Sequence, residues 1–159
     1  MKTLILILFC ASLAYAQCPM HSEHSKEHSA GVDERGDHAM GFDHAKTTHH
    51  FLIKDEGGVI QVTANDVNDT ESRDQIRAHL SHIAIMFSQG NFDLPMFIHD
   101  RVPPGVSVMK QLNQEITYRY EAMDQGGRVV ISSKNTEAVA AVHEFLRFQI
   151  EDHRTGDPR

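Results

Sequence analysis

Residues 49–64 read HHFLIKDEGGVIQVTA, two runs of alternating apolar residues joined by a turn-forming tetrapeptide. Phe51 and Ile53 share one face of the first run, and Ile60 and Val62 share one face of the second. Successive strand residues point to opposite faces of a sheet, so this alternation predicts half-buried strands. The intervening Asp-Glu-Gly-Gly favours a tight turn. The stretch therefore predicts a β-hairpin.

A helix is expected directly after this hairpin. Residues 68–71 read NDTE, the residue types that cap a helix N-terminus. Apolar residues then recur at intervals of four, three and four, which predicts one buried helix face ending near Gly90. These residues are Ile76, Leu80, Ile83 and Phe87.

The second half of the chain repeats the pattern. Residues 116–131 again alternate around an Asp-Gln-Gly-Gly turn, and capping residues at 135–137 open an amphipathic stretch to Ile150. Either a duplicated ββα unit or the common chemistry of turns and caps explains the match. We expect a two-layer α+β domain in which two helices cover one face of a four-stranded antiparallel sheet. Between the halves, 91–105 reads as a loop or short irregular strand and 106–113 as a short helix.

The N-terminal part has a different composition. Residues 1–16 combine a Lys, an apolar run and a final Ala-Tyr-Ala, which predicts a cleaved signal peptide and no stable membrane span in the mature chain. Residues 17–45 contain few apolar residues, so we expect a flexible His-rich arm. The α+β domain is expected over 46–159. Cys18, the one thiol left after cleavage, is a metal ligand, an intermolecular bridge or an acylation site.

Charge and motifs exclude several function classes. The 159 residues carry 15 Lys and Arg against 22 Asp and Glu, a formal charge of -7 that argues against a nucleic-acid partner. Gly-x-Ser-x-Gly and His-Glu-x-x-His are both missing from the sequence, and Arg147 stands where the second His of the latter would follow His143 and Glu144. The motifs therefore give no support to an enzyme.

The arm is rich in metal-binding side chains. Imidazole, thiolate and thioether together suit copper, zinc or nickel, and the thioethers place copper first and zinc second. The alternative is a solvated linker with incidental histidines. The candidate arm ligands are Cys18, Met20, His21, His24, His28, His38, Met40 and His44.

Two resemblances point in the same direction. Cys18-Pro19-Met20-His21 resembles the core of the heavy-metal-binding motif of copper-efflux and related exported proteins, which implies metal binding. Over about residues 36–157 the chain is similar to small exported bacterial proteins of uncharacterised function, which implies a fold unit and an exported bacterial setting. The residues that carry this second likeness are MGFD at 40–43, KTTHHF at 46–51, VPPGV at 102–106 and EFLRFQI at 144–150.

Four domain histidines are further candidate ligands: His49, His79, His82 and His143. If the two halves pack pseudo-symmetrically, His49, His79 and His143 approach one another between sheet and helices, and His82 lies within reach of His79. Unconnected structural roles are the alternative. His153, at the end of the last predicted helix, is explained by the helix dipole.

The sequence thus predicts a secreted or periplasmic transition-metal-binding protein that buffers, delivers or sequesters copper or zinc. A second hypothesis is a protein-interaction module for a partner of the cell envelope. Its docking surface would be the open sheet face with His50, Leu52, Thr117 and Arg119. A third is a binder of haem or another small ligand that uses His49, His79 or His143.

Overall fold

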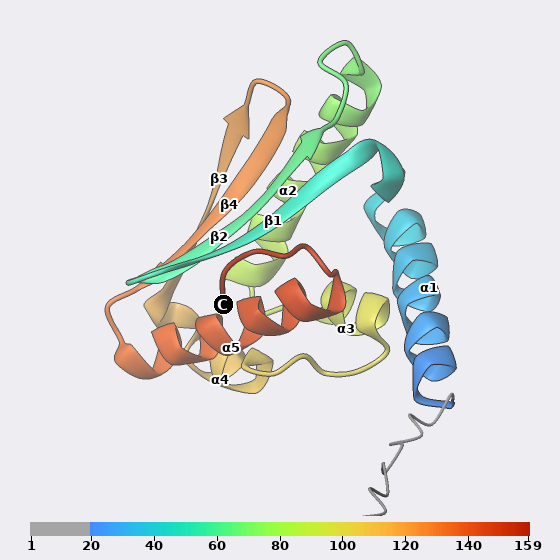
Figure 1. Ribbon diagram of the computed structural model, residues 1–159. Helices are drawn as coiled ribbons and strands as arrows, with labels where there is room; N and C mark the ends of the chain where they lie inside the picture. Colours follow the sequence, from blue (N-terminus) through green and yellow to red (C-terminus); the bar gives the residue numbers. More distant parts are fainter. Residues whose placement is uncertain (1–19) are drawn as a thin grey trace, which may run out of the picture.

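The computed structural model describes residues 20–159, with side chains from Glu27 onward, and two ββα units follow one another in it (Figure 1). The first unit contains β1 (Thr47–Lys54), β2 (Gly57–Ala64) and α2 (Thr70–Ser88), and the second contains β3 (Ile116–Met123), β4 (Gly126–Ser133) and α5 (Thr136–Asp152). The other elements are α1 (Met20–Met40), η1 (His44–Lys46), α3 (Asp93–His99), α4 (Val106–Gln111) and η2 (Asn113–Glu115). Both predicted hairpins and both predicted long helices are confirmed.

The four strands form one antiparallel sheet in the order β1-β2-β4-β3. The central pair β2 and β4 is in register about Ile60 and Val129, which occupy equivalent positions in their hairpins. A Cβ on Gly126 would lie 2.2 Å from the carbonyl oxygen of Val62, so this glycine permits the close approach of the two central strands. The two halves are therefore built alike and meet at the middle of the sheet.

The helices α2 and α5 cover one face of the sheet in a crossed arrangement. α2 packs chiefly on β3 and β4, whereas α5 packs on β1 and β2. Asp69 and Asn135 cap the two helices, because each side chain accepts backbone N–H bonds of the first turn. The predicted apolar face of α2 is buried in the core, together with Phe145 and Leu146 of α5.

A helix, α3, stands where a loop or irregular strand was expected. Pro95 is the third residue of α3, and a proline in the first turn removes no intrahelical hydrogen bond. Ile98 and His99 are buried, and Asp100 ends the helix in the left-handed conformation with φ 51°. A proline usually interrupts a helix, and only its position in the first turn makes it compatible with α3. The short helix predicted at 106–113 is present as α4.

Helix α1 also differs from the flexible segment expected over residues 17–45. From Met20 to Met40 the chain is helical, and Val32 is only 1% exposed. Polar contacts hold the helix against the rest of the protein: the Arg35 Nε donates to the carbonyl oxygen of Ile98 at 2.8 Å, and Arg154 donates to both carboxylate oxygens of Asp33 at 2.8 Å. The low hydrophobicity of the segment concealed these tertiary contacts, which local periodicity does not report.

The C-terminal tail covers the outer edge of β1 (Figure 1). Asp157 accepts a hydrogen bond from the backbone N–H of Phe51 at 2.9 Å and pairs with His50 at 2.8 Å. A strand edge with free N–H groups is a template for unwanted pairing, and this carboxylate occupies it. Over residues 20–159, none of the helices is at once long and apolar enough to cross a membrane.

Candidate metal centre

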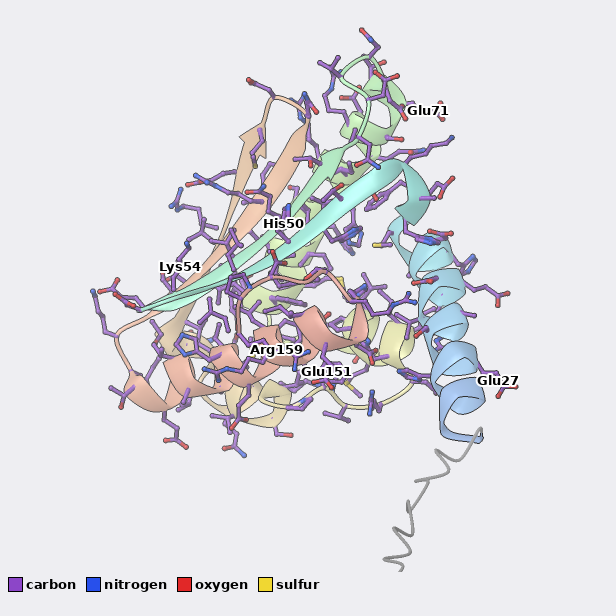
Figure 2. All side chains as sticks on the ribbon, viewed as in Figure 1. Glu27, His50, Lys54, Glu71, Glu151 and Arg159 are labelled. Carbon is purple, nitrogen blue, oxygen red and sulfur yellow. The ribbon has the colours of Figure 1, made fainter. Side chains whose placement is uncertain are left out.

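Four histidines line one cavity of about 60 Å³ between the sheet and the helices. His49 comes from β1 and His79 from α2, whereas His99 ends α3 and His153 directly follows α5. The rest of the wall is mainly aliphatic and aromatic. Side chains fill most of the space between the sheet and α5 (Figure 2). β1, α2, α3 and the residue after α5 therefore each contribute one imidazole to this small space.

The rings form a row rather than a closed cluster. The centroids of His49 and His153 are 5.9 Å apart with planes within 8° of parallel, and His153 lies 5.0 Å from His99 in a perpendicular arrangement. Phe42 links the row to α2, because its ring lies 6.1 Å from His49 and 5.6 Å from His79. The row thus runs from α2 through β1 to the ends of α5 and α3.

His99 is fixed at the end of this row. Its Nδ1 lies 2.5 Å from a carboxylate oxygen of Asp152, and its Nε2 lies 2.9 Å from the side-chain oxygen of Gln149. Asp152 also pairs with His28 of α1 at 2.9 Å and with Arg101 at 3.1 Å. Burial raises the pKa of Asp152, but hydrogen bonds from His99 and His28 outweigh it, so its pKa stays below the ordinary value. Both ring nitrogens of His99 face acceptors, which gives it a structural role.

His49, His79 and His153 are uncharged at neutral pH. Burial lowers the pKa of His49 and of His79 to about 4 each, and that of His153 to about 3; neighbouring imidazoles add to the effect. A neutral imidazole keeps one nitrogen lone pair for a ligand. The Nε2 of His49 is buried without a hydrogen-bond partner among the described residues. Such an orphaned atom in a cavity wall is suited to metal ligation.

A thioether completes this set of donors. Met40, the last residue of α1, lines the same cavity, and Gly41 follows it with φ 76°. Met40, His49 and His153 also line a second, more polar pocket of about 240 Å³ beside α1 and the start of β1. We call this the outer pocket. The three residues therefore stand at the boundary between the outer pocket and the inner cavity.

The predicted domain ligands divide into two groups. The structure brings His49 and His79 to the cavity, but His82 is exposed on α2. His143 lies elsewhere, with its Nε2 2.9 Å from the carbonyl oxygen of Lys54. The predicted convergence of His49, His79 and His143 is therefore wrong in its third member.

The position of His143 follows from the repeated architecture. His143 is the eighth residue of α5, and Arg77 is the eighth residue of α2. Arg77 donates to the carbonyl oxygen of Met123 at 2.6 Å, and Met123 ends β3 as Lys54 ends β1. Each side chain thus forms a hydrogen bond with the last carbonyl group of the first strand in the hairpin of the other half. His143 has a structural role that its apolar flanking residues did not reveal.

The candidate ligands of the predicted arm lie in several different environments. Cys18 lies outside the described residues, as do the side chains of Met20, His21 and His24. Met40 reaches the cavity, His28 binds Asp152, and His38 is exposed. The donor atoms of His44, Asp37 and Asp43 all lie within 4.8 Å of one another on the surface. Asp37 accepts from the backbone of His44 and Asp43 from that of Ala45, so these contacts are explained by the local chain turn.

Sequence reasoning missed His99 and His153 as members of the cavity. His153 was assigned to the helix dipole, an effect that requires a charged ring, whereas burial holds its pKa at about 3. His99 pairs with Asp152, which lies 53 positions away in the sequence. The sequence signal available was a histidine at the end of each apolar segment. This pattern does not indicate which residues the histidines contact.

The same geometry bears on the two alternative hypotheses. A cavity of about 60 Å³ accommodates an ion or a few water molecules and is far smaller than a porphyrin, which disfavours haem inside it. On the open sheet face, His50, which is labelled in Figure 2, forms a hydrogen bond with Asp157 of the C-terminal tail. Comparison of the chain with family models, with curated proteins and with solved structures found no match.

Proposed function

We propose that this protein binds a transition metal ion in the histidine-lined cavity, with copper as the first candidate and zinc as the second. One observation carries the proposal. Met40, His49, His79 and His153 meet at one cavity as uncharged donors, and the His49 Nε2 has no partner among the described residues. Thioether and imidazole donors are those that copper prefers, and imidazole alone also suits zinc.

Ring spacing supports a shared ion. With metal to nitrogen distances of about 2.0–2.1 Å, two imidazoles on one ion have centroids about 5–6 Å apart. His49 and His153 have a centroid separation of 5.9 Å. Their planes are nearly parallel, so one ring turns about its side-chain torsions when the ion binds. Asp152 and Gln149 keep His99 out of the ligand set and fix the wall behind it.

We further propose that the protein acts after export, in the periplasm or outside the cell, where it buffers, delivers or sequesters the ion. The signal-like residues 1–16 support export, and the motif at 18–21 supports metal capture. In this proposal Cys18, Met20, His21 and His24 make the first contact with the ion, and the cavity retains it. An envelope partner would receive the ion.

The test compares ion content in matched variants of the chain from Gln17 to Arg159. The double variant His49→Gln/His153→Gln removes two cavity imidazoles, and His82→Gln/His143→Gln is the control with the same composition change. Each protein is equilibrated with Cu(I) or Zn(II) against a chelator of known affinity, gel-filtered and analysed for metal. We expect loss of one bound ion in the cavity variant only. Equal metal in both variants would refute the cavity as the binding site.

A further inference from the structure

The wall of the inner cavity offers metal donors without a negative charge. Its donors are imidazoles, the thioether of Met40 and the amide of Gln149, and none of its described lining residues is Asp, Glu or Cys. The carboxylate of Asp152, adjacent in sequence to His153, is occupied by His99, His28 and Arg101. The ligands of an ion in this cavity would therefore leave its positive charge uncompensated.

The outer pocket adds little net negative charge near these donors. Asp33 is the carboxylate among its described lining residues, and both its oxygens accept from Arg154 at 2.8 Å. One guanidinium nitrogen of Arg154 contacts both oxygens, so the carboxylate and the guanidinium form an ion pair without net charge. The boundary between the two pockets is thus close to neutral before an ion arrives.

Charge then discriminates between ions. The Born cost of transferring an ion from water into a low-dielectric site grows with the square of its charge, so a dication without anionic ligands is disfavoured relative to a monocation. Cu(I) is also a soft ion that accepts thioether ligands, unlike the harder Zn(II). The apolar wall and the neutral donors favour a soft monovalent ion for these two independent reasons.

We propose that the boundary of the two pockets is a site for soft monovalent ions, Cu(I) and its analogue Ag(I), with Met40, His49 and His153 as the ligands. This inference rests on the proposed metal-binding function and adds the valence of the ion and the sulfur ligand. The three residues are those that line both pockets, so they lie where the polar outer pocket adjoins the inner cavity.

The site is complete only when α1 is packed in place. Met40 is the last residue of α1, and the buried Val32 together with the Arg35 bond to the carbonyl oxygen of Ile98 fixes the helix. A bound ion would link the end of α1 to β1 and to the end of α5. Ion binding therefore stabilises the docked position of the helix.

The experiment uses the chain from Gln17 in a Cys18→Ser background, because a thiolate binds Cu(I) by itself. Met40→Leu removes the thioether at nearly constant volume. Met86→Leu is the matched control, since Met86 packs partly buried against the core and does not line either pocket. Affinities for Cu(I) and Zn(II) are measured by chelator competition under anaerobic reducing conditions. Ag(I) is followed by NMR of methionine methyl groups.

We expect Met40→Leu to weaken Cu(I) and Ag(I) binding by about tenfold or more, at least the loss seen when even outer partners of a metal site are removed. Zn(II) binding should be unchanged, and the methyl signal of Met40 should shift with Ag(I). Unchanged Cu(I) affinity in Met40→Leu would overturn the inference. If His49→Gln/His153→Gln still abolished Zn(II) binding, the proposed function would survive that result. If that double variant altered no ion, the proposed function would fail as well.

Discussion

Acidification should destabilise the metal-free protein through the cavity histidines. The pKa of His49 and of His79 is about 4 in the folded state, and that of His153 is about 3, against an ordinary value of 6.5. A lowered histidine pKa means that the unfolded chain binds more protons than the folded one. The free energy of unfolding therefore falls as the pH drops from 6.5 toward the folded pKa values.

The size of the effect follows from proton linkage. One proton costs about 1.36 kcal/mol per pH unit, so each histidine can remove up to about 2 kcal/mol between pH 6.5 and pH 5. Residual exposure of the rings reduces this to about 1–2 kcal/mol each, and to about 3–6 kcal/mol for all three. Total stabilities are about 5–15 kcal/mol, so the loss is a large share of the whole.

Urea unfolding at pH 7, 6 and 5 in the presence of EDTA measures this loss by circular dichroism. His79→Gln should remove about a third of the pH dependence, whereas His82→Gln, on the exposed side of the same helix, should leave it intact. Carboxylates titrate mainly below this range and contribute little to it. A free energy of unfolding that is equal at pH 7 and pH 5 would refute the lowered pKa values of these half-buried histidines. An equal effect of the two substitutions would do the same.

Three further predictions concern stability at neutral pH, each measured by urea unfolding. Tyr118→Phe should stabilise the protein by about 1 kcal/mol, because the buried Tyr118 hydroxyl has no hydrogen-bond partner among the described residues; a loss of stability would contradict this. Gly126→Ala should cost several kcal/mol or prevent folding, because its Cβ would lie 2.2 Å from the Val62 oxygen, and a wild-type midpoint would argue against the sheet register. Asp152→Asn should cost about 3 kcal/mol by removing the carboxylate that pairs with the buried His99 ring, and a loss no larger than that of Asp74→Asn, at an exposed ion pair, would show that the pairing is weak.

Local sequence patterns predicted the parts of the fold that local physics determines. Strand alternation around 55–58 and the capping residues at 68–71 located the first hairpin and helix, because turns and caps depend on neighbours in sequence. α1 was not predicted, since its helix is held by Val32 and by Arg35 against distant residues. The composition of a segment does not indicate which distant residues it will contact.

The candidate site was predictable only in part for the same reason. His49 was placed on the helix-facing side of its strand, and this is confirmed by its position in the cavity wall. Partners such as His99 and Asp152, or His143 and Lys54, are separated by 53 and 89 positions, and only the packing brings them together. Side-chain type indicated metal chemistry, whereas the choice among histidines required the tertiary arrangement.

The two similar halves explain why the cavity occurs once. His49 and Tyr118 occupy the same pair position counted from their turns, and His79 and Phe145 are each the tenth residue of their helices. In the second half these aromatic rings pack against Phe87 and Phe92 and fill the core.

In the first half the equivalent positions carry imidazoles, and elements outside the repeat complete the space. α1 adds Met40, and His153 follows the end of α5. In the second unit these two positions carry aromatic rings that fill the core. In the first unit they carry imidazoles, whose nitrogens are available as donors. Replacing His49 by Tyr and His79 by Phe would make the first half resemble the second, and this pair of changes should remove the proposed metal binding while the fold persists.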